Sequence, residues 1–447
     1  MSSPDSILIA GASAAGLATA EALRRHGYAG RLTLLDAEPH LPYDRPPLSK
    51  QVLAGAWEPG RAQLRTQEQL DALGAEFVRG EPATALNAAA RTITTASGRV
   101  LHGDVLVVAT GLTPSHLPGQ NGPASGSAGG SPRGTASGSP GGATSGPASG
   151  SAGGAAGGWA GVHVLRGLDH ALTLRAHLSA AERLVVVGEG VLGAEIAATA
   201  RTMGLDVTLA GMGRTLLGDQ LGDVLGAMLA EAHIARGVRL RLGAPVDGLT
   251  GADGRVTGVR LATGELLPAD AVVVAIGCRP ATGWLAGSGL TVGDGVECDS
   301  RCRAAEGVYA VGDVASFEHE GIGRRLRLEN RTNATEQAQV VAANILGADR
   351  PYLPIPYFWT DQYDIKIQAH GLPSPAAEVS IAEGDPAQHR FAAVYREGGR
   401  ITGVLGWNMA KQARLLRQQS LGDWQAQAQT QAQAQTQAQT TPPLTPA

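Results

Sequence analysis

The stretch ILIAGASAAG at residues 7–16 decides the fold class of this chain. An apolar run leads directly into Gly11, and Gly16 opens a helix-like run. In the GxGxxG pattern the first glycine permits a tight turn, the second lets backbone approach a pyrophosphate, and the third lets helix pack on strand. Because free N–H groups at the helix start attract phosphates, this context predicts a dinucleotide site. Ser13 stands where the middle glycine is usual, so a Gly/Ala-rich packing turn is the alternative for this stretch alone.

A second copy of the pattern, LVVVGEGVLG at residues 184–193, carries all three glycines and is followed by Glu195. It has the same strand–turn–helix context, so packing alone is a weak explanation of the two motifs together. Each motif predicts one bound dinucleotide. The pair therefore predicts a protein in which one dinucleotide passes electrons to another.

Length and composition exclude several classes of protein. The 447 residues suit two or three domains, and a net charge of -4 gives no pull toward nucleic acid or membrane. The three cysteines form no dense disulfide framework, which fits a reducing cytoplasm. No segment is apolar for long enough to span a bilayer. We expect a cytoplasmic protein with no nucleic-acid partner, no membrane partner and no metal site.

Two segments differ in composition from the rest of the chain. Residues 120–158 are almost wholly Gly, Ser, Ala and Pro, and the tail after Trp424 alternates Gln, Ala and Thr. Neither can bury enough apolar surface to offset the entropy of ordering. We expect a disordered, dispensable insert at 119–159 and a disordered tail at 424–447.

The remaining motifs carry a family resemblance. They are HLPYDRPPLSK at 40–50, ATG at 109–111, VYAVGD at 308–313, TNATEQA at 332–338 and YFWTDQYD at 357–364. With the two glycine motifs, their order resembles the two-dinucleotide flavoprotein reductases. More narrowly, it is similar to the ferredoxin and rubredoxin reductases that serve bacterial oxygenases. The likeness covers about residues 5–118 and 160–417.

The resemblance implies an α/β fold with two interleaved Rossmann-like domains, like glutathione reductase, and a smaller C-terminal α+β domain. An FAD-binding domain at 1–118 and 283–333 would enclose an NAD(P)-binding domain at 160–282, with the C-terminal domain at 334–423. The implied activity is that of an FAD-dependent oxidoreductase. It would take hydride from NADH or NADPH and pass single electrons to a ferredoxin or rubredoxin type iron–sulfur protein.

The same likeness suggests which residues form the site. Lys50 and Glu195 would pair near the reactive edge of the flavin as the catalytic residues, although a surface lysine is the simpler interpretation of Lys50 alone. Asp36 would accept hydrogen bonds from a ribose, unless it is a solvated strand-end acid, and Asp313 would hold the ribityl chain. The expected cofactor-binding residues are Gly11, Ser13, Ala14, Ala15, Gly16, Asp36, Arg45, Lys50, Ala83, Thr110, Gly111, Arg166, Gly188, Gly190, Gly193, Glu195, Arg214, Gly277, Gly312, Asp313 and Arg331.

The choice of nicotinamide depends on the turn after Val207-Thr208-Leu209. An acid about 20 residues past such a glycine motif selects against the extra phosphate of NADPH. Relatives often carry glutamate at the place of Gly211, and this turn has no acid. Because Arg214 could reach the phosphate, the sequence predicts that NADPH is accepted.

Three other functions stay open. The chain could reduce a small acceptor such as a quinone, oxygen or peroxide, or be a non-catalytic redox-sensing flavoprotein. A dithiol reductase would use Cys298 and Cys302, which are more simply explained as buried thiols.

A basic docking face is expected for an acidic ferredoxin, with ordinary solvated side chains as the alternative. The candidates are Arg324, Arg325, Arg327, Lys411, Arg414 and Arg417.

Overall fold

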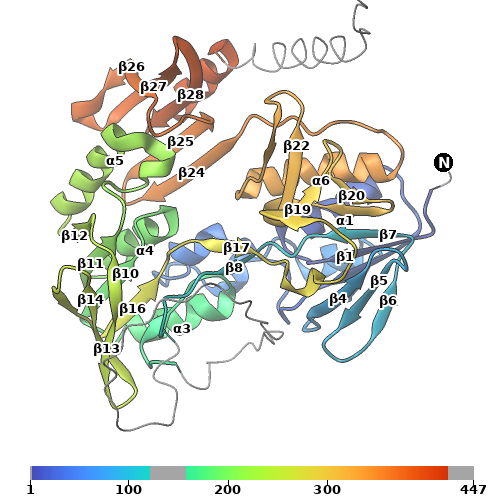
Figure 1. The fold of residues 1–447 in the computed structure, drawn as a ribbon, viewed down its shortest axis with the longest axis horizontal. Helices are drawn as coiled ribbons and strands as arrows, with labels where there is room; N and C mark the ends of the chain where they lie inside the picture. The colour runs from blue at the N-terminus through green and yellow to red at the C-terminus, as the bar shows by residue number, and fades with distance from the viewer. Residues whose placement is uncertain (1–2, 121–157, 421–447) are drawn as a thin grey trace, which may run out of the picture.

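The first parallel sheet has the first glycine motif at its centre. The computed structural model describes residues 3–120 and 158–420 (Figure 1). β1 (Ser6–Ala10) is buried along its whole length because helices or other strands cover both of its faces. The sheet order is β20-β21-β7-β1-β2-β3, and all pairings but β20–β21 are parallel. The other strands are β2 (Arg31–Leu35), β3 (Glu76–Val78), β7 (Val105–Val108), β20 (Arg303–Ala305) and β21 (Val308–Ala310).

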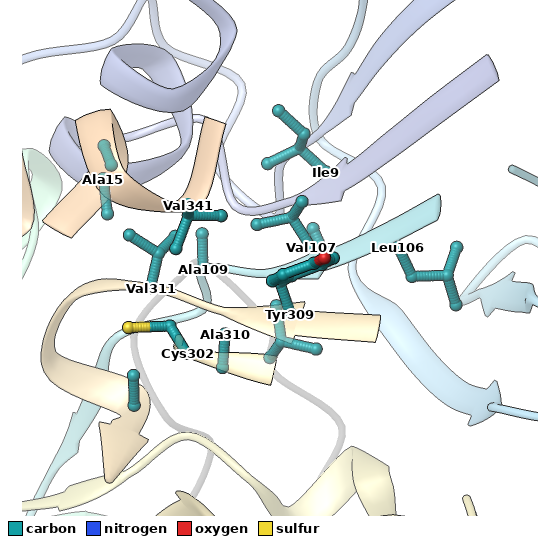
Figure 2. Close-up of a cluster of buried hydrophobic side chains, with 14 of the residues drawn as sticks. Ile9, Ala15, Leu106, Val107, Ala109, Cys302, Tyr309, Ala310, Val311 and Val341 are labelled. Carbon is teal, nitrogen blue, oxygen red and sulfur yellow. The ribbon is translucent and has the colours of Figure 1, made fainter. Parts of the chain in front are cut away.

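Two helices pack against each other on this sheet, α1 (Ala14–Arg25) and α6 (Arg331–Ile345). Figure 2 shows Ala15 of α1 and Val341 of α6 together with Val107 and Tyr309 from the central strands. Their apolar side chains form one continuous core, so the two helices shield this sheet from solvent.

The second parallel sheet has the second motif at its centre, in the order β12-β11-β10-β16-β9. α4 (Val191–Thr202) follows β10 directly, as the motif predicts, and packs against β10 and β11. The strands are β9 (Val162–His163), β10 (Arg183–Val187), β11 (Asp206–Gly211), β12 (Arg239–Leu242) and β16 (Ala271–Val274), and the other helices are α3 (Leu168–Leu178) and α5 (Gly218–Ala235).

The chain passes between the two halves along a single two-stranded ribbon. β8 (Leu112–Pro114) leaves the first half after β7, and β17 (Cys278–Pro280) returns from the second half after β16. The two strands are antiparallel partners, with Arg279 opposite Thr113. The second half is thus inserted between two strands of the first, which confirms the predicted pair of interleaved Rossmann-like domains.

A five-stranded antiparallel sheet, ordered β24-β25-β28-β27-β26, follows α6. It packs on α5 of the second half, where the Tyr395 hydroxyl donates to the Leu221 carbonyl at 3.0 Å (Figure 1). Residues 410–420 are helical. The strands are β24 (Tyr357–Gln362), β25 (Ile365–Gly371), β26 (Glu378–Asp385), β27 (Arg390–Glu397) and β28 (Arg400–Trp407).

Smaller elements complete the described chain. Three smaller sheets, in which all strand pairings but one are antiparallel, extend both halves, and a short helix, α2 (Gln67–Asp71), begins at a Thr66 cap. The strands are β4 (Ala83–Asn87), β5 (Thr92–Thr95), β6 (Val100–His102), β13 (Val246–Ala252), β14 (Arg255–Leu261), β15 (Leu266–Pro268), β18 (Val292–Gly293), β19 (Gly295–Cys298), β22 (Ala315–His319) and β23 (Arg324–Leu326).

The packing of α6 changes one expected boundary. The division expected between residues 333 and 334 falls inside this helix, whose buried residues belong to the core of the first sheet. We therefore propose that the C-terminal unit begins after α6. The expected insert and tail lie outside the described residues, apart from residues 119–120 and 158–159. None of the helices in residues 3–120 and 158–420 is long and apolar enough to cross a membrane.

Candidate functional site

A cavity of about 800 Å³ lies between the two nucleotide-binding halves, and the C-terminal sheet contributes part of its wall. Tyr357, Phe358 and Trp359 of one strand and Gly371 of the next form that part. The structure brings thirteen of the predicted site residues to the wall. They are Ser13, Ala14, Ala15, Arg45, Lys50, Thr110, Gly111, Arg166, Gly190, Glu195, Gly277, Asp313 and Arg331.

The glycines of the first motif lie beneath this wall and shape its backbone. Gly11 has φ +106°, and a Cβ there would lie 2.3 Å from the Ala109 carbonyl oxygen. A Cβ on Gly16 would lie 1.8 Å from the Gly11 oxygen. Only glycine fits at either position, so the turn is tight and the start of α1 faces the cavity.

The second motif has the same geometry. Gly188 has φ +123°, with the Ala275 oxygen 2.2 Å from where a Cβ would lie. A Cβ on Gly193 would lie 1.9 Å from the Gly188 oxygen. The two motifs thus present two helix starts to the space between the halves, which suits two pyrophosphates.

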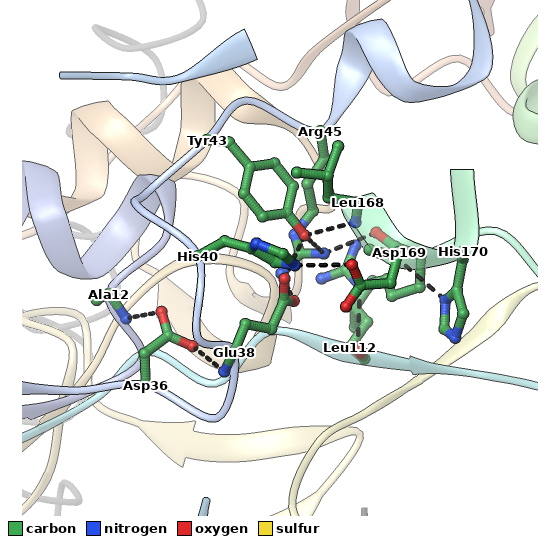
Figure 3. Close-up of polar contacts among 12 residues, drawn as sticks. Ala12, Asp36, Glu38, His40, Tyr43, Arg45, Leu112, Leu168, Asp169 and His170 are labelled. Carbon is green, nitrogen blue, oxygen red and sulfur yellow. Dashed lines mark hydrogen bonds and ion pairs between the residues drawn. The ribbon is translucent and has the colours of Figure 1, made fainter. Parts of the chain in front are cut away.

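Asp36 lies at the end of β2, beside the first motif (Figure 3). Its carboxylate accepts the N–H groups of Ala12 at 3.0 Å and Glu38 at 3.1 Å. Burial raises the pKa of the Asp36 carboxyl. The side chain therefore joins the glycine turn to the next loop, at the edge of the site and not on the cavity wall. The N–H of Glu81 donates to the Asp36 carbonyl, and this contact brings Ala83, two residues further along the chain, near Asp36. Ala83 is also absent from the cavity wall.

Arg45 is held in a polar network that links the two halves (Figure 3). Its guanidinium donates to Glu38 Oε1 at 2.9 Å and to the Arg166 carbonyl at 2.6 Å. The Tyr43 hydroxyl donates to Glu38 and accepts the N–H of Leu168 at 2.9 Å. Glu38 already balances the charge of Arg45, so this arginine fixes the loop at the start of α3 as well as facing the cavity. Arg331 is paired in a similar way with Asp44, at 2.8 Å.

Lys50 and Glu195 form a buried ion pair across the halves. Lys50 Nζ lies 2.8 Å from Glu195 Oε2, and the two side chains are 11% and 7% exposed. Glu195 also accepts the hydroxyls of Ser49 at 2.6 Å and Thr360 at 2.8 Å. The Lys50 ammonium lies 5.1 Å from the centre of the Trp359 ring, within the range of a cation–π contact. Four groups from three parts of the fold therefore fix one cation in the cavity wall.

Asp313 presents a carboxylate with unused hydrogen-bonding capacity. Its nearest cation is Arg166, 4.0 Å away, and no donor in the described part of the chain bonds its carboxylate oxygens. Burial raises the pKa of this carboxyl. Gly312, with φ +77°, positions it by donating its N–H to Gln337 Oε1 at 2.7 Å. Hydroxyl groups of a bound polyol would satisfy a carboxylate in this state.

These features fit FAD as the resident cofactor of the first half. The start of α1 suits the pyrophosphate, Asp313 suits a chain of hydroxyls, and Lys50 offers a cation at the inner wall. When bound, FAD supplies the redox chemistry, since it accepts electrons in pairs and releases them singly.

The cysteines contribute no dithiol to this cavity. Cys278 lines it alone, whereas Cys298 and Cys302 are buried in the core of the first sheet (Figure 2 labels Cys302). Burial raises the pKa of Cys302 to about 12, so its reactive thiolate is scarce at neutral pH. Among the described residues, no group of His, Cys, Asp and Glu could hold a metal ion.

Several residues that shape the site were missed from the sequence. Ser49 and Thr360 lie within the motifs quoted above, but nothing in the pattern shows that both donate to Glu195. Glu189 was also missed, although it stands inside the second motif. Eight predicted residues do not line the cavity: Gly11, Gly16, Asp36, Ala83, Gly188, Gly193, Arg214 and Gly312.

Comparison with known proteins places the chain in a family. Residues 5–338 match the family model described as pyridine nucleotide-disulphide oxidoreductase, and residues 357–441 match a reductase C-terminal model. A ferredoxin reductase subunit of 5,5'-dehydrodivanillate O-demethylase from Sphingobium is 34% identical over 400 residues, which cover 89% of this chain and 88% of that protein.

Two solved structures agree with the fold. A ferredoxin reductase from Rhodopseudomonas palustris is 31% identical, with a TM-score of 0.81 over 92% of this chain and 93% of that one. A putidaredoxin reductase, solved in covalent complex with putidaredoxin, is 30% identical, with a TM-score of 0.80 over 93% of this chain and 92% of that one. Together with the two glycine motifs and the cavity between them, these matches show that the chain belongs to the pyridine nucleotide-disulphide oxidoreductase family.

Proposed function

We propose that this protein is an FAD-dependent reductase that takes hydride from a nicotinamide dinucleotide and passes single electrons to a ferredoxin or rubredoxin type iron–sulfur protein. The observation that carries the proposal is the buried Lys50–Glu195 pair, which joins the two nucleotide-binding halves inside their shared cavity. A cation there stabilises negative charge that develops on a bound ring.

The protein's own share of the reaction is positioning and electrostatics. Ser49 and Thr360 hold the Glu195 carboxylate, and that carboxylate holds the Lys50 ammonium toward the cavity. Hydride transfer itself requires no acid–base residue of the protein. The site thus needs no cysteine pair, which separates it from dithiol reductases of the same family.

An iron–sulfur acceptor is supported by the basic C-terminal helix at residues 410–420. Lys411 and Arg414 are exposed on it. Burial raises the pKa of Tyr357 in the cavity wall, and the charge of Arg414 acts in the opposite direction. Two arginines of the other group of candidates are weaker. Arg325 is paired with Glu318 at 3.1 Å, and Arg327 is 13% exposed and paired with Asp294 and Glu329.

The relatives support the same acceptor. Two of those reported above are named as ferredoxin reductases, and the third is a putidaredoxin reductase solved bound to putidaredoxin. We extend this role to the present chain and place it in an oxygenase system. The free state of Cys278, Cys298 and Cys302 supports a reducing compartment such as the cytoplasm.

The test is an anaerobic reduction followed by a choice of acceptor. The purified protein should show a flavin absorption spectrum that bleaches on addition of NADH or NADPH. It should then reduce a bacterial ferredoxin faster than it reduces a quinone, oxygen or peroxide. Steady turnover with a small acceptor and none with any of several ferredoxins or rubredoxins would favour the small-acceptor alternative. Stable flavin with negligible turnover would favour a redox-sensing protein.

A further inference from the structure

The turn after β11 contains a carboxylate that the local sequence does not reveal. Glu189, the second residue of the second motif, points its side chain across to Gly211 and Gly213. Its Oε1 accepts the Gly213 N–H at 2.6 Å. Its Oε2 would lie 1.9 Å from a Cβ placed on Gly211. The carboxylate therefore fills the space that a side chain at position 211 would otherwise occupy.

This position is where a dinucleotide fold recognises the adenosine ribose. An acid at the end of the second strand of the unit hydrogen-bonds the ribose 2′-hydroxyl. β11 is that strand, paired in register with β10 from Arg183–Asp206 to Val187–Ala210, and it ends at Gly211. The two glycines in this turn admit the Glu189 side chain, since any larger residue at 211 would collide with it.

The carboxylate is also free to act on a ligand. Oε1 is held by Gly213, whereas no donor among the described residues bonds Oε2. Glu189 is half-buried and fixed through its backbone, because its carbonyl accepts the N–H of Leu217 at 2.9 Å. One oxygen therefore holds the side chain in place while the other can accept a hydroxyl proton.

The nearby cations do not favour a phosphate. Arg214 is 85% exposed and lies 3.9 Å from Asp223. Arg239 and Arg241 of β12 are each paired with a carboxylate, Asp206 at 2.7 Å and Glu265 at 2.8 Å. A 2′-phosphate bound in this turn would thus lie close to the fixed negative charge of Glu189. Each of the three nearby arginines already has a carboxylate partner.

We propose that Glu189 selects the nicotinamide nucleotide by accepting a hydrogen bond from the ribose 2′-hydroxyl of NADH and by repelling the 2′-phosphate of NADPH. The selecting carboxylate thus comes from the glycine motif itself instead of from the end of β11. From the acid-free turn alone NADPH was expected to be accepted, whereas the Glu189 carboxylate predicts discrimination against it. The inference rests on the proposed function, because it concerns the hydride donor of that reaction.

The experiment measures binding as well as turnover. Dissociation constants of NAD⁺ and NADP⁺ for the oxidised, FAD-loaded protein are obtained by titration calorimetry, and kcat/KM is measured with NADH and NADPH. We expect NAD⁺ to bind at least about tenfold more tightly than NADP⁺, since like charges brought together at an interface are strongly disfavoured. Glu189→Gln keeps the shape of the side chain and removes its charge. It should therefore lower the ratio of the NADP⁺ to the NAD⁺ dissociation constant at least about fivefold.

Two further variants make the test specific. Glu189→Gly combined with Gly211→Glu moves the carboxylate back to the strand end and should restore the preference for NAD⁺. Glu182→Gln removes an exposed acid of the same half and should leave the ratio unchanged. Equal affinity for the two nucleotides in the unmodified protein, or an unchanged ratio in Glu189→Gln, would overturn this inference alone. Failure of both nucleotides to bind and to reduce the flavin would instead overturn the proposed function.

Discussion

Replacing Lys50 by methionine tests the electrostatic centre of the site. The substitution keeps the length of the side chain but removes the ammonium that lies 2.8 Å from Glu195. Because the two side chains are only 11% and 7% exposed, the carboxylate left behind has little access to water. Removing one partner of such a buried pair costs roughly 3–5 kcal/mol. Ser49 and Thr360 still donate to Glu195, so we expect a loss near the lower end, about 3 kcal/mol.

The loss of stability is measured by urea unfolding of the FAD-loaded protein. The rate of flavin reduction is measured by anaerobic stopped-flow mixing with the nicotinamide nucleotide. Lys50→Met should lower the flavin reduction potential and slow reduction at least about tenfold, which corresponds to roughly 1.4 kcal/mol of barrier. In the double variant Lys50→Met/Glu195→Gln the unpaired charge is gone, so most of the lost stability should return.

Thr360→Val is the matched control, because it removes a donor to Glu195 without changing the cation. It should lower stability by about 1.5–3 kcal/mol, the value of a hydrogen bond to a charged group, and leave the potential near that of the unmodified protein. Unchanged reduction kinetics in Lys50→Met, or strictly additive losses in the double variant, would refute the role assigned to the pair.

Three other predictions follow from the described contacts. Asp313→Ala should weaken FAD binding at least about tenfold in reconstitution of the apoprotein, since a carboxylate hydrogen bond to a ligand is lost; full flavin content with unchanged affinity would contradict this. Burial lowers the pKa of His233 to about 4 from 6.5, so the unfolded chain binds more protons in that window and the free energy of unfolding falls as pH drops through it. His233→Asn should flatten this dependence in urea titrations, whereas the exposed His26→Asn should not. Reversing Arg414 and Arg417 to glutamate should slow ferredoxin reduction at low salt but not reduction of a neutral dye, because screening shortens from about 10 Å at 0.1 M to about 3 Å at 1 M; equal effects on both acceptors would remove the case for this docking face.

The sequence predicted the parts of the fold that depend on local pattern. After one polar first residue, β1 and β10 are continuous apolar runs that end in glycine turns, and the steric contacts at Gly11 and Gly188 explain why those turns need glycine. The boundary expected at residue 334 stays a prediction, and the packing of α6 on the first sheet favours a later one. An amphipathic helix must bury its apolar face, but its pattern does not say which sheet it covers.

Contacts between distant segments could not be predicted from the local sequence pattern. Lys50 and Glu195 are 145 positions apart, and the family resemblance, not the spacing, suggested their pairing. Thr360 is 165 positions from Glu195, so their contact depends on how β24 packs on α4. The direction of the Glu189 side chain depends in the same way on the two glycines across the turn.

The paired strands β8 and β17 have a consequence for how this architecture tolerates extra residues. The two crossings between the halves lie side by side, so the chain enters and leaves the inserted half at the same place. Residues 121–157 follow β8 in the sequence and belong to neither of the two paired strands. The register of β8 on β17 fixes the spacing of the two halves at this crossing, however many residues come next. Length can thus accumulate at this point in evolution while the distance between the two nucleotide sites stays constant.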